Sequence, residues 1–271
     1  MQRKIIVSGC GGLHTQNPFL DAYILAQSNK ENPKICLLPT ASADSSYIVK
    51  EFYQIYQSLP CDPSHLSLFN PHTSHIEDFI MSQDIIFVSG GHSKNMMGIW
   101  KEWGVDKYLK QAYENGTILS GGSAGSVCWF DQCITDSIPK DLTVMNCLGF
   151  LPYSNCPHFA SGTRRQSYLK HLQQGTIKPG YAACDFAALH FVDEKLFRSV
   201  SIDKKMRCYE GVINPSKDDP TKMTASLVRI PTFSIQENQK EFIWDTPTFA
   251  AYTNQATVEE ESPVLVEESV Q

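Results

Sequence analysis

Short apolar runs alternate with longer amphipathic segments through the first part of the chain. The runs are bounded by Gly, Pro or Ser, which is typical of buried strands. We predict strands at Lys4–Ser8, Ile35–Leu38, Leu66–Phe69, Ile85–Val88 and Thr117–Leu119. Two intervening segments, Ser46–Ser58 and Asn95–Asn115, repeat apolar residues at helical spacing, and Gly116 is placed to end the second helix.

This alternation of strands and helices predicts an α/β fold: a three-layer α/β/α arrangement whose mostly parallel sheet is covered on both faces. In such sheets functional groups gather where the strands end at their carboxyl side. The polar and Gly-rich segments of this chain follow the predicted strands at Gly9–Gly12, Pro39–Ser42, Ser89–His92 and Ser120–Gly125. We therefore expect the site at that edge of the sheet.

The length of 271 residues fits one large domain rather than two. The strand–helix rhythm is lost after about residue 215. We expect a catalytic α/β domain over residues 1–214, an extension over 215–254 that packs on it, and an acidic, disordered tail over 255–271.

Composition excludes several classes of protein. The net charge is −6 and no Lys/Arg-rich stripe is present, which argues against a nucleic-acid partner. No stretch reaches the roughly 18 apolar residues of a membrane span. The apolar run at the start is too short for a signal peptide, so a cytoplasmic protein is expected. The nine cysteines are odd in number and irregular in spacing, and without an export signal they are expected to be reduced thiols. Neither a metal site nor a cofactor is expected.

The sharpest local pattern is Gly121-Gly122-Ser123-Ala124-Gly125, a G-x-S-x-G sequence between an apolar strand and a segment able to open a helix. A serine on such a turn is held in a strained backbone and needs small neighbours. The Ala124 N–H is then placed to face a developing oxyanion, and the Gly90-Gly91 pair after the preceding strand offers a second donor. The alternative is a plain Gly-rich turn.

A serine nucleophile needs a base and an orienting acid. Among eight histidines, His171 is expected on a helix surface and His190 in the core. His158 follows Pro157, which fixes the preceding backbone. Asp185 lies among small apolar residues, where a buried carboxylate needs a partner. Three further histidines are expected in solvent: His65, His72 and His75. Residue type alone does not decide among these histidines.

Four ordered motifs resemble the dipeptidase E and cyanophycinase family of serine peptidases. The resemblance runs from about Lys4 to Tyr209. The motifs are a Gly-rich segment at Phe87–Asn95, a nucleophile motif at Gly122–Gly125, a histidine motif at Cys156–His158 and an acid-bearing segment at Gly180–Phe191. Four motifs in the family's order are far more specific than one G-x-S-x-G pattern.

The resemblance implies a fold like that of class I glutamine amidotransferases and a triad of Ser123, His158 and Asp185. It also implies Gly91 and Ala124 as oxyanion donors. The order Ser, His, acid differs from the Ser, acid, His order of α/β-hydrolases, which ranks an esterase or lipase second. The Gly-rich segment departs from the family pattern: Ser89 replaces a Gly, and His92-Ser93 stands where Asn-Thr is common.

The expected partner is a small peptide, because the family's dipeptidases cleave after an N-terminal aspartate and its cyanophycinases cut β-aspartyl-arginine units. Arg164 and Arg165 are candidates to bind the substrate carboxylate, since a guanidinium grips a carboxylate with two hydrogen bonds. His92 is a further candidate substrate-binding residue. The alternatives are two solvated arginines, an amidase or esterase for non-peptide substrates, and a non-catalytic binding protein. Assembly into a homodimer is left open.

Overall fold

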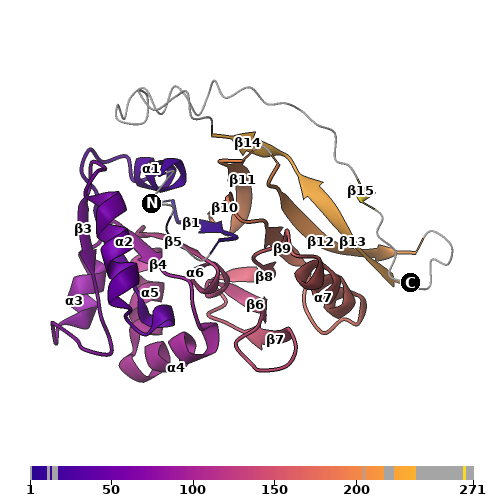
Figure 1. Cartoon of the computed structure of the whole chain (residues 1–271), viewed down its shortest axis with the longest axis horizontal. Coiled ribbons are helices and arrows are strands. Elements are labelled where there is room, and N and C mark those ends of the chain that lie inside the picture. Colours follow the sequence, from indigo (N-terminus) through magenta and orange to yellow (C-terminus); the bar gives the residue numbers. More distant parts are fainter. Residues whose placement is uncertain are drawn as a thin grey trace.

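Two β-sheets with helices packed on them make up the fold (Figure 1). The computed structural model describes residues 2–10, 13, 18–203, 205–216, 223–235 and 265–266. The tail expected at 255–271 lies outside these residues apart from the two-residue strand Leu265–Val266.

The first sheet has eight strands. Their order is β14 (Thr232–Ser234), β11 (Lys195–Ser201), β10 (Ala187–Val192), β1 (Lys4–Ser8), β5 (Ile118–Gly122), β4 (Ile85–Val88), β2 (Lys34–Leu38) and β3 (Asp62–His65). Strands β1, β5, β4, β2 and β3 run parallel, and β10 pairs antiparallel with β1. The parallel block is the mostly parallel sheet that the sequence predicts.

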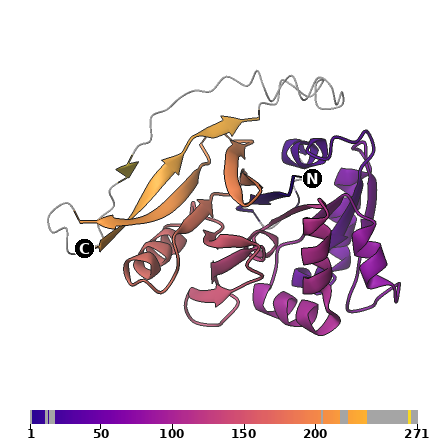
Figure 2. The same cartoon turned by 180° about the vertical axis from the view of Figure 1, so that it is seen from behind.

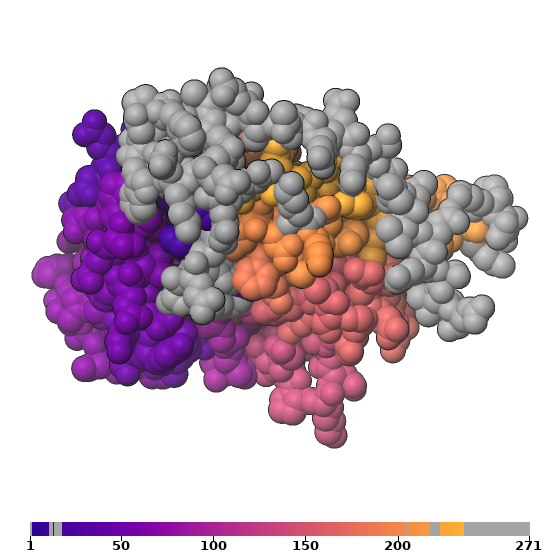
Figure 3. All heavy atoms as spheres, turned by 45° about the horizontal axis from the view of Figure 1, so that its top comes forward, coloured from indigo at the N-terminus to yellow at the C-terminus, as the bar shows by residue number. Residues whose placement is uncertain are grey.

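The second sheet has seven strands. Its order is β15 (Leu265–Val266), β13 (Met223–Ile230), β12 (Cys208–Pro215), β9 (Gly180–Ala183), β8 (Leu151–Cys156), β6 (Phe130–Thr135) and β7 (Thr143–Asn146). Strands β6, β8 and β9 are parallel. In Figure 3 the earlier elements (indigo and purple) and the later ones (salmon and orange) form adjoining regions of one surface.

Helices cover both faces of the first sheet. Helices α1 (Phe19–Ala26) and α2 (Ser46–Tyr56) share a buried cluster with Ile6 and Ile35. Helices α3 (Ile76–Met81), α4 (Ser93–Trp103) and α5 (Val105–Glu114) share another with Ile5 and Val7. Successive residues of a strand point to opposite faces, so Ile5 and Ile6 face different helices. This confirms the three-layer α/β/α prediction.

Three further elements are the 3₁₀ turn η1 (Thr40–Ser42), the one-turn helix α6 (Ala124–Val127) and the 12-residue helix α7 (Gly162–Gln173). Helix α7 packs against β12 and β13, as the views from both sides show (Figures 1 and 2). Part of the extension expected after residue 214 is therefore strand β13, which continues the second sheet.

Three predicted elements differ in the structure. The strand predicted at Thr117–Leu119 is β5, which runs from Ile118 to Gly122. The helix predicted at Asn95–Asn115 is two helices, because Gly104 adopts the left-handed backbone (φ 70°) that ends α4. The strand predicted at Leu66–Phe69 is wrong, since β3 is at Asp62–His65. Beyond β3, the N–H groups of Leu68 and Phe69 bond to the Asp44 carboxylate instead of a neighbouring strand. The leucines are still buried, which explains the apolar pattern.

All nine cysteines lie in the described part of the chain, and none of them forms a disulfide. In the same described residues, no group of three or more His, Cys, Asp and Glu side chains is arranged to hold a metal ion. None of the helices described has the length and apolar character needed to cross a membrane.

Candidate active site

Ser123 occupies a strained turn between β5 and α6. Its backbone angles are φ 54° and ψ −112°, a combination that side-chain-bearing residues rarely adopt. The turn is held because the Ser123 N–H donates to the carbonyl of Ser8 on β1 (3.3 Å), while Ser126 and Val127 donate back to the Ser123 carbonyl. Neighbouring strands thus impose the strain, which lifts the Ser123 hydroxyl to the carboxyl edge of the sheet.

The glycines around Ser123 are required by close backbone packing. A Cβ on Gly122 would lie 1.7 Å from the Cys10 carbonyl oxygen, and one on Gly125 would lie 2.0 Å from the Val88 carbonyl oxygen. Neither neighbour is a flexible side chain, so a larger residue would push β1 or β4 away from the turn. The G-x-S-x-G sequence is therefore explained by the contacts of the turn itself.

His158 follows the second sheet but is attached to the first. The residue lies after β8 with a left-handed backbone (φ 54°), and its N–H donates to the carbonyl of Gly9 (3.2 Å). The next residue, Phe159, donates to the carbonyl of Ala183 at the end of β9. A Cβ on Gly9 would lie 2.3 Å from the Ala183 and Cys184 carbonyl oxygens. Gly9 thus permits the close approach that brings the histidine to the sheet edge.

Asp185 lies at the corner where the chain passes from β9 in the second sheet to β10 in the first. The Ala187 N–H donates to the Cys184 carbonyl, which closes a four-residue turn with Asp185 and Phe186 at its centre. Phe186 has φ 64°. The main-chain carbonyl of Phe186 accepts hydrogen bonds from Ser201 Oγ and from the Ile202 N–H. The carboxylate is therefore held on a well-anchored turn.

The three side chains form one hydrogen-bonded line. His158 Nε2 lies 2.9 Å from Ser123 Oγ, and His158 Nδ1 lies 2.6 Å from Asp185 Oδ1. The side chains of His158 and Asp185 are 31% and 39% exposed, so the line is open to solvent at one side. A nucleophile bonded to a base that is bonded to an acid is the arrangement used in acyl transfer.

Comparison with known proteins places this geometry in a family. The model of peptidase family S51 matches residues 5–199. The chain belongs to peptidase family S51. It is 45% identical over 210 residues to the uncharacterized peptidase YgaJ of Bacillus subtilis (strain 168), covering 76% of this chain and 91% of YgaJ. The S51 chain is accordingly a serine-type peptidase, a hydrolase.

Weaker matches of this S51 peptidase are one further sequence and two solved structures that share its fold. The uncharacterized peptidase Lmo0363 of Listeria monocytogenes is 25% identical over 141 residues, covering 49% of this chain and 69% of Lmo0363. A Listeria monocytogenes EGD-e structure assigned as a peptidase E superposes with a TM-score of 0.57 at 15% identity, covering 75% of this chain and 100% of that one. The structure of a peptidase from an acI-B1 Actinobacterium superposes with a TM-score of 0.58 at 13% identity, covering 79% of this chain and 89% of that one.

The predicted oxyanion donors of the S51 peptidase follow adjacent strands. Val88 of β4 pairs with Gly121 of β5, and Gly91 and Ala124 each lie three residues beyond that pair. Gly91 has φ 141°, and a Cβ there would lie 2.2 Å from the Ala41 carbonyl oxygen. The loop carrying Gly91 is therefore packed tightly on η1.

The other predicted side chains have defined contacts. His92 caps α4 by accepting the Asn95 N–H at Nδ1 (3.2 Å). Arg164 donates to Asp136 (2.6 Å), and its side chain is 12% exposed. Arg165 lies over the rings of Phe159 and Tyr209, at 5.5 and 5.4 Å from their centroids. Phe159 directly follows His158 in the chain, and its ring is fully buried.

Residues that the sequence did not single out also support the site. Ser126 and Asn155 are fully buried and joined by a hydrogen bond. Asp136 holds Arg164 from the loop after β6. No local motif marks these residues, because each of them acts through a partner distant in the sequence.

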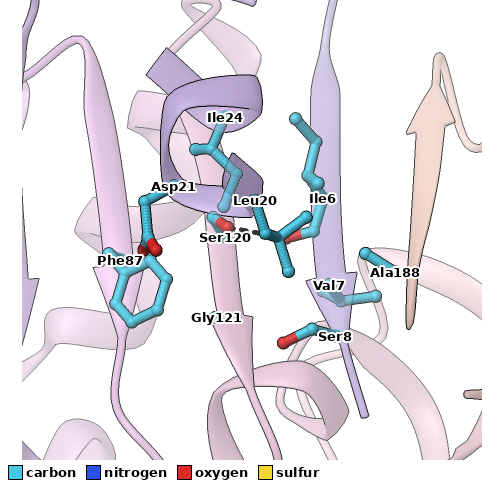
Figure 4. A pocket seen from close by; sticks show the side chains of 10 residues that line it. All are labelled: Ile6, Val7, Ser8, Leu20, Asp21, Ile24, Phe87, Ser120, Gly121 and Ala188. Atoms are coloured by element: carbon cyan, nitrogen blue, oxygen red, sulfur yellow. Dashed lines mark hydrogen bonds between the residues drawn. The ribbon is translucent and has the colours of Figure 1, made fainter. Parts of the chain in front are cut away.

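A buried carboxyl group lies behind the nucleophile turn. Asp21 on α1 is 4% exposed; one of its oxygens accepts a hydrogen bond from Tyr56, and the other has no partner among the described residues. Burial raises the pKa of Asp21 to about 7. A cavity of about 10 Å³, enough for one water molecule, lies between Asp21, Ser8 and Gly121. Figure 4 shows the side chains that line this cavity, with Asp21 and Phe87 among them.

Proposed function

We propose that this peptidase hydrolyses small peptides through an acyl-enzyme formed on Ser123. The observation that supports it most directly is the hydrogen-bonded line from Ser123 through His158 to Asp185. His158 Nε2 takes the hydroxyl proton as Ser123 Oγ attacks the carbonyl carbon. Asp185 accepts the Nδ1–H hydrogen bond, which fixes the tautomer and stabilises the imidazolium. His158 then returns the proton to the leaving amine, and water releases the acyl group.

The oxyanion is assigned to the main-chain N–H groups of Gly91 and Ala124. Their equal offset from the paired residues Val88 and Gly121 supports this assignment, because it brings both turns to the same edge of the sheet. Preorganised donors of this kind contribute about 3–4 kcal/mol each to transition-state stabilisation in well-studied enzymes. Of the two departures from the family pattern in this loop, His92 serves as the N-cap of α4.

Serine rather than cysteine is the proposed nucleophile. Cys10 and Cys184 flank the site in sequence, and both thiols are buried. Burial raises the pKa of each thiol, so the thiolate needed for attack is scarce at neutral pH. Ser123 has its base at 2.9 Å instead.

For the substrate we propose an N-terminal aspartyl peptide, with Arg165 as the cation that binds the acidic side chain. Its position over Phe159, next to His158, supports this choice. Arg164, whose guanidinium binds Asp136, is kept as the second candidate. His92 is proposed to border the same pocket from the loop after β4.

A panel of Xaa-Leu dipeptides, including α- and β-linked Asp-Leu, tests the proposal with Ser123→Ala as the control. Cleavage of the aspartyl members alone, lost in the variant while circular dichroism stays unchanged, is the expected result. A fluorophosphonate probe should label Ser123 of the native enzyme and nothing in the variant.

Other outcomes separate the alternatives. Labelling of Ser123 without cleavage of any dipeptide would indicate a different acyl substrate, which p-nitrophenyl esters would then identify. Undiminished turnover by Ser123→Ala would remove Ser123 as nucleophile. Absence of both labelling and turnover would favour a binding protein built on this fold.

A further inference from the structure

Two thiols meet in the hairpin that follows the nucleophile turn. Cys133 lies on β6 and pairs with Met145 on β7, and Cys147 follows two residues after Met145. Residues two apart on a strand share a face, so both thiols project to the same side of the hairpin. The distance between Cys147 Sγ and Cys133 Sγ is 3.6 Å, close to contact.

The surroundings of the pair give the two cysteines different access to solvent. Cys133 is fully buried, whereas Cys147 is partly exposed. A small oxidant therefore reaches Cys147 first. The contact with Cys133, together with burial, raises the pKa of Cys147 well above that of a free thiol. Cys128 and Asp131 also face Cys147 and act in the same direction. Reaction through the thiolate should accordingly be slow at neutral pH and faster at alkaline pH.

We propose that Cys133 and Cys147 are an oxidation site that forms a disulfide when the protein meets hydrogen peroxide. The Cys147 thiolate attacks one peroxide oxygen, the O–O bond breaks, and a sulfenic acid and one water form. The Cys133 sulfur then attacks the Cys147 sulfur, the S–O bond breaks, and the second water leaves. One peroxide is reduced for each pair of thiols oxidised, so the step is balanced.

The disulfide would close a ring around the loop between β6 and β7. That loop carries Asp136, which binds Arg164 on α7, and Ser137, whose Oγ accepts the Lys94 N–H of α4 (3.5 Å). Closing a ring of this size restricts the unfolded chain. We expect the oxidised protein to melt roughly 5 °C or more above the reduced protein. The site is separate from the proposed chemistry of Ser123 and does not depend on it.

The experiment treats the full chain with hydrogen peroxide at mildly alkaline pH, then alkylates remaining thiols and maps peptides by mass spectrometry. The expected product is a Cys133–Cys147 linked peptide that dithiothreitol releases, formed faster as pH rises. Cys147→Ser should prevent the link. Cys61→Ser is the matched control, because Cys61 is also partly exposed, and it should leave the link unchanged.

Several results would overturn the proposal. Oxidation of Cys147 to a sulfinic acid without a linked peptide would show that Cys133 cannot resolve the sulfenic acid. The proposal would also be contradicted if either cysteine linked preferentially to another thiol. Full retention of both thiols after prolonged exposure would contradict it as well. These readouts use native protein, so they stand even if the Cys147→Ser variant fails to fold.

Discussion

Ser126 Oγ donates a hydrogen bond to Asn155 Oδ1 across 3.2 Å, and both side chains are completely buried. Ser126 lies three residues after Ser123 on the one-turn helix α6, and Asn155 lies three residues before His158 on β8. The bond therefore connects the turn that carries the proposed nucleophile to the strand that leads to the proposed base. It joins elements whose separation fixes the Ser123–His158 distance.

Ser126→Ala should lower kcat about tenfold with little change in KM, because small misplacement of a base costs rate more than binding. Ser154→Ala is the matched control: Ser154 is buried on the same strand but bonds to Tyr168 and to the Lys178 carbonyl. The control should lower Tm and leave kcat unchanged. Equal kcat values for both variants, measured on folded protein, would argue against positioning by Ser126.

Gly9→Ala should abolish activity and strongly destabilise the fold. Its Cβ would meet the Ala183 and Cys184 carbonyl oxygens at 2.3 Å, so β1 and β9 would have to separate and the Gly9–His158 hydrogen bond would be lost. Gly98→Ala is the control, since that glycine lies inside α4 with no atom within 4 Å of an added Cβ. It should gain about 0.5–1 kcal/mol of stability. Urea unfolding and turnover of both variants check these expectations.

Asp21 should make the free energy of unfolding fall as the pH rises. The folded protein raises the pKa of Asp21 from 3.8 to about 7, so it binds a proton that the unfolded chain releases. This contribution is fully present below pH 3.8 and is lost as the pH rises to about 7. The free energy of unfolding should thus fall relative to Asp21→Asn by up to ~4 kcal/mol across that window. Urea titrations of both proteins at several pH values measure this, and parallel profiles would contradict it.

Arg164 and Arg165 should differ in how strongly their substitution changes the preference for Asp-Leu over Ala-Leu. Arg165→Ala should lower kcat/KM for Asp-Leu about 10- to 100-fold relative to Ala-Leu, through loss of a charge-assisted hydrogen bond. Arg164→Ala should change this ratio little, because Arg164 binds Asp136. Steady-state kinetics on both dipeptides decide between them, and the opposite ranking would assign the carboxylate to Arg164.

The sequence predicted the elements whose residues are buried on both sides. Strands β1, β2 and β4 lie within one residue of their predicted bounds, since continuous apolar runs mark them directly. Gly104 was missed as a break because apolar residues keep helical spacing on both sides of it. The second sheet was missed because its strands are interrupted by polar and proline residues, as at Pro152 in β8.

The sequence predicted the site residues that belong to a local motif. It did not predict those that are brought together only by long-range packing. His190 was expected in the core, and it is 1% exposed with Nδ1 bonded to Tyr23. The motifs led to Ser123, His158 and Asp185, and the structure places their side chains in contact. Ser126 with Asn155, and Cys133 with Cys147, are pairs joined only by folding, so no spacing rule identifies them.

Ser123 is carried by the eight-stranded sheet, whereas His158 comes from the seven-stranded sheet. Each residue keeps its own geometry if the two sheets shift slightly against one another, but the 2.9 Å contact between them does not survive. The hydrolytic rate should therefore respond to smaller movements between the two sheets than a spectroscopic signal of folding does. On heating, the enzyme should lose its hydrolytic activity while its secondary structure is still intact.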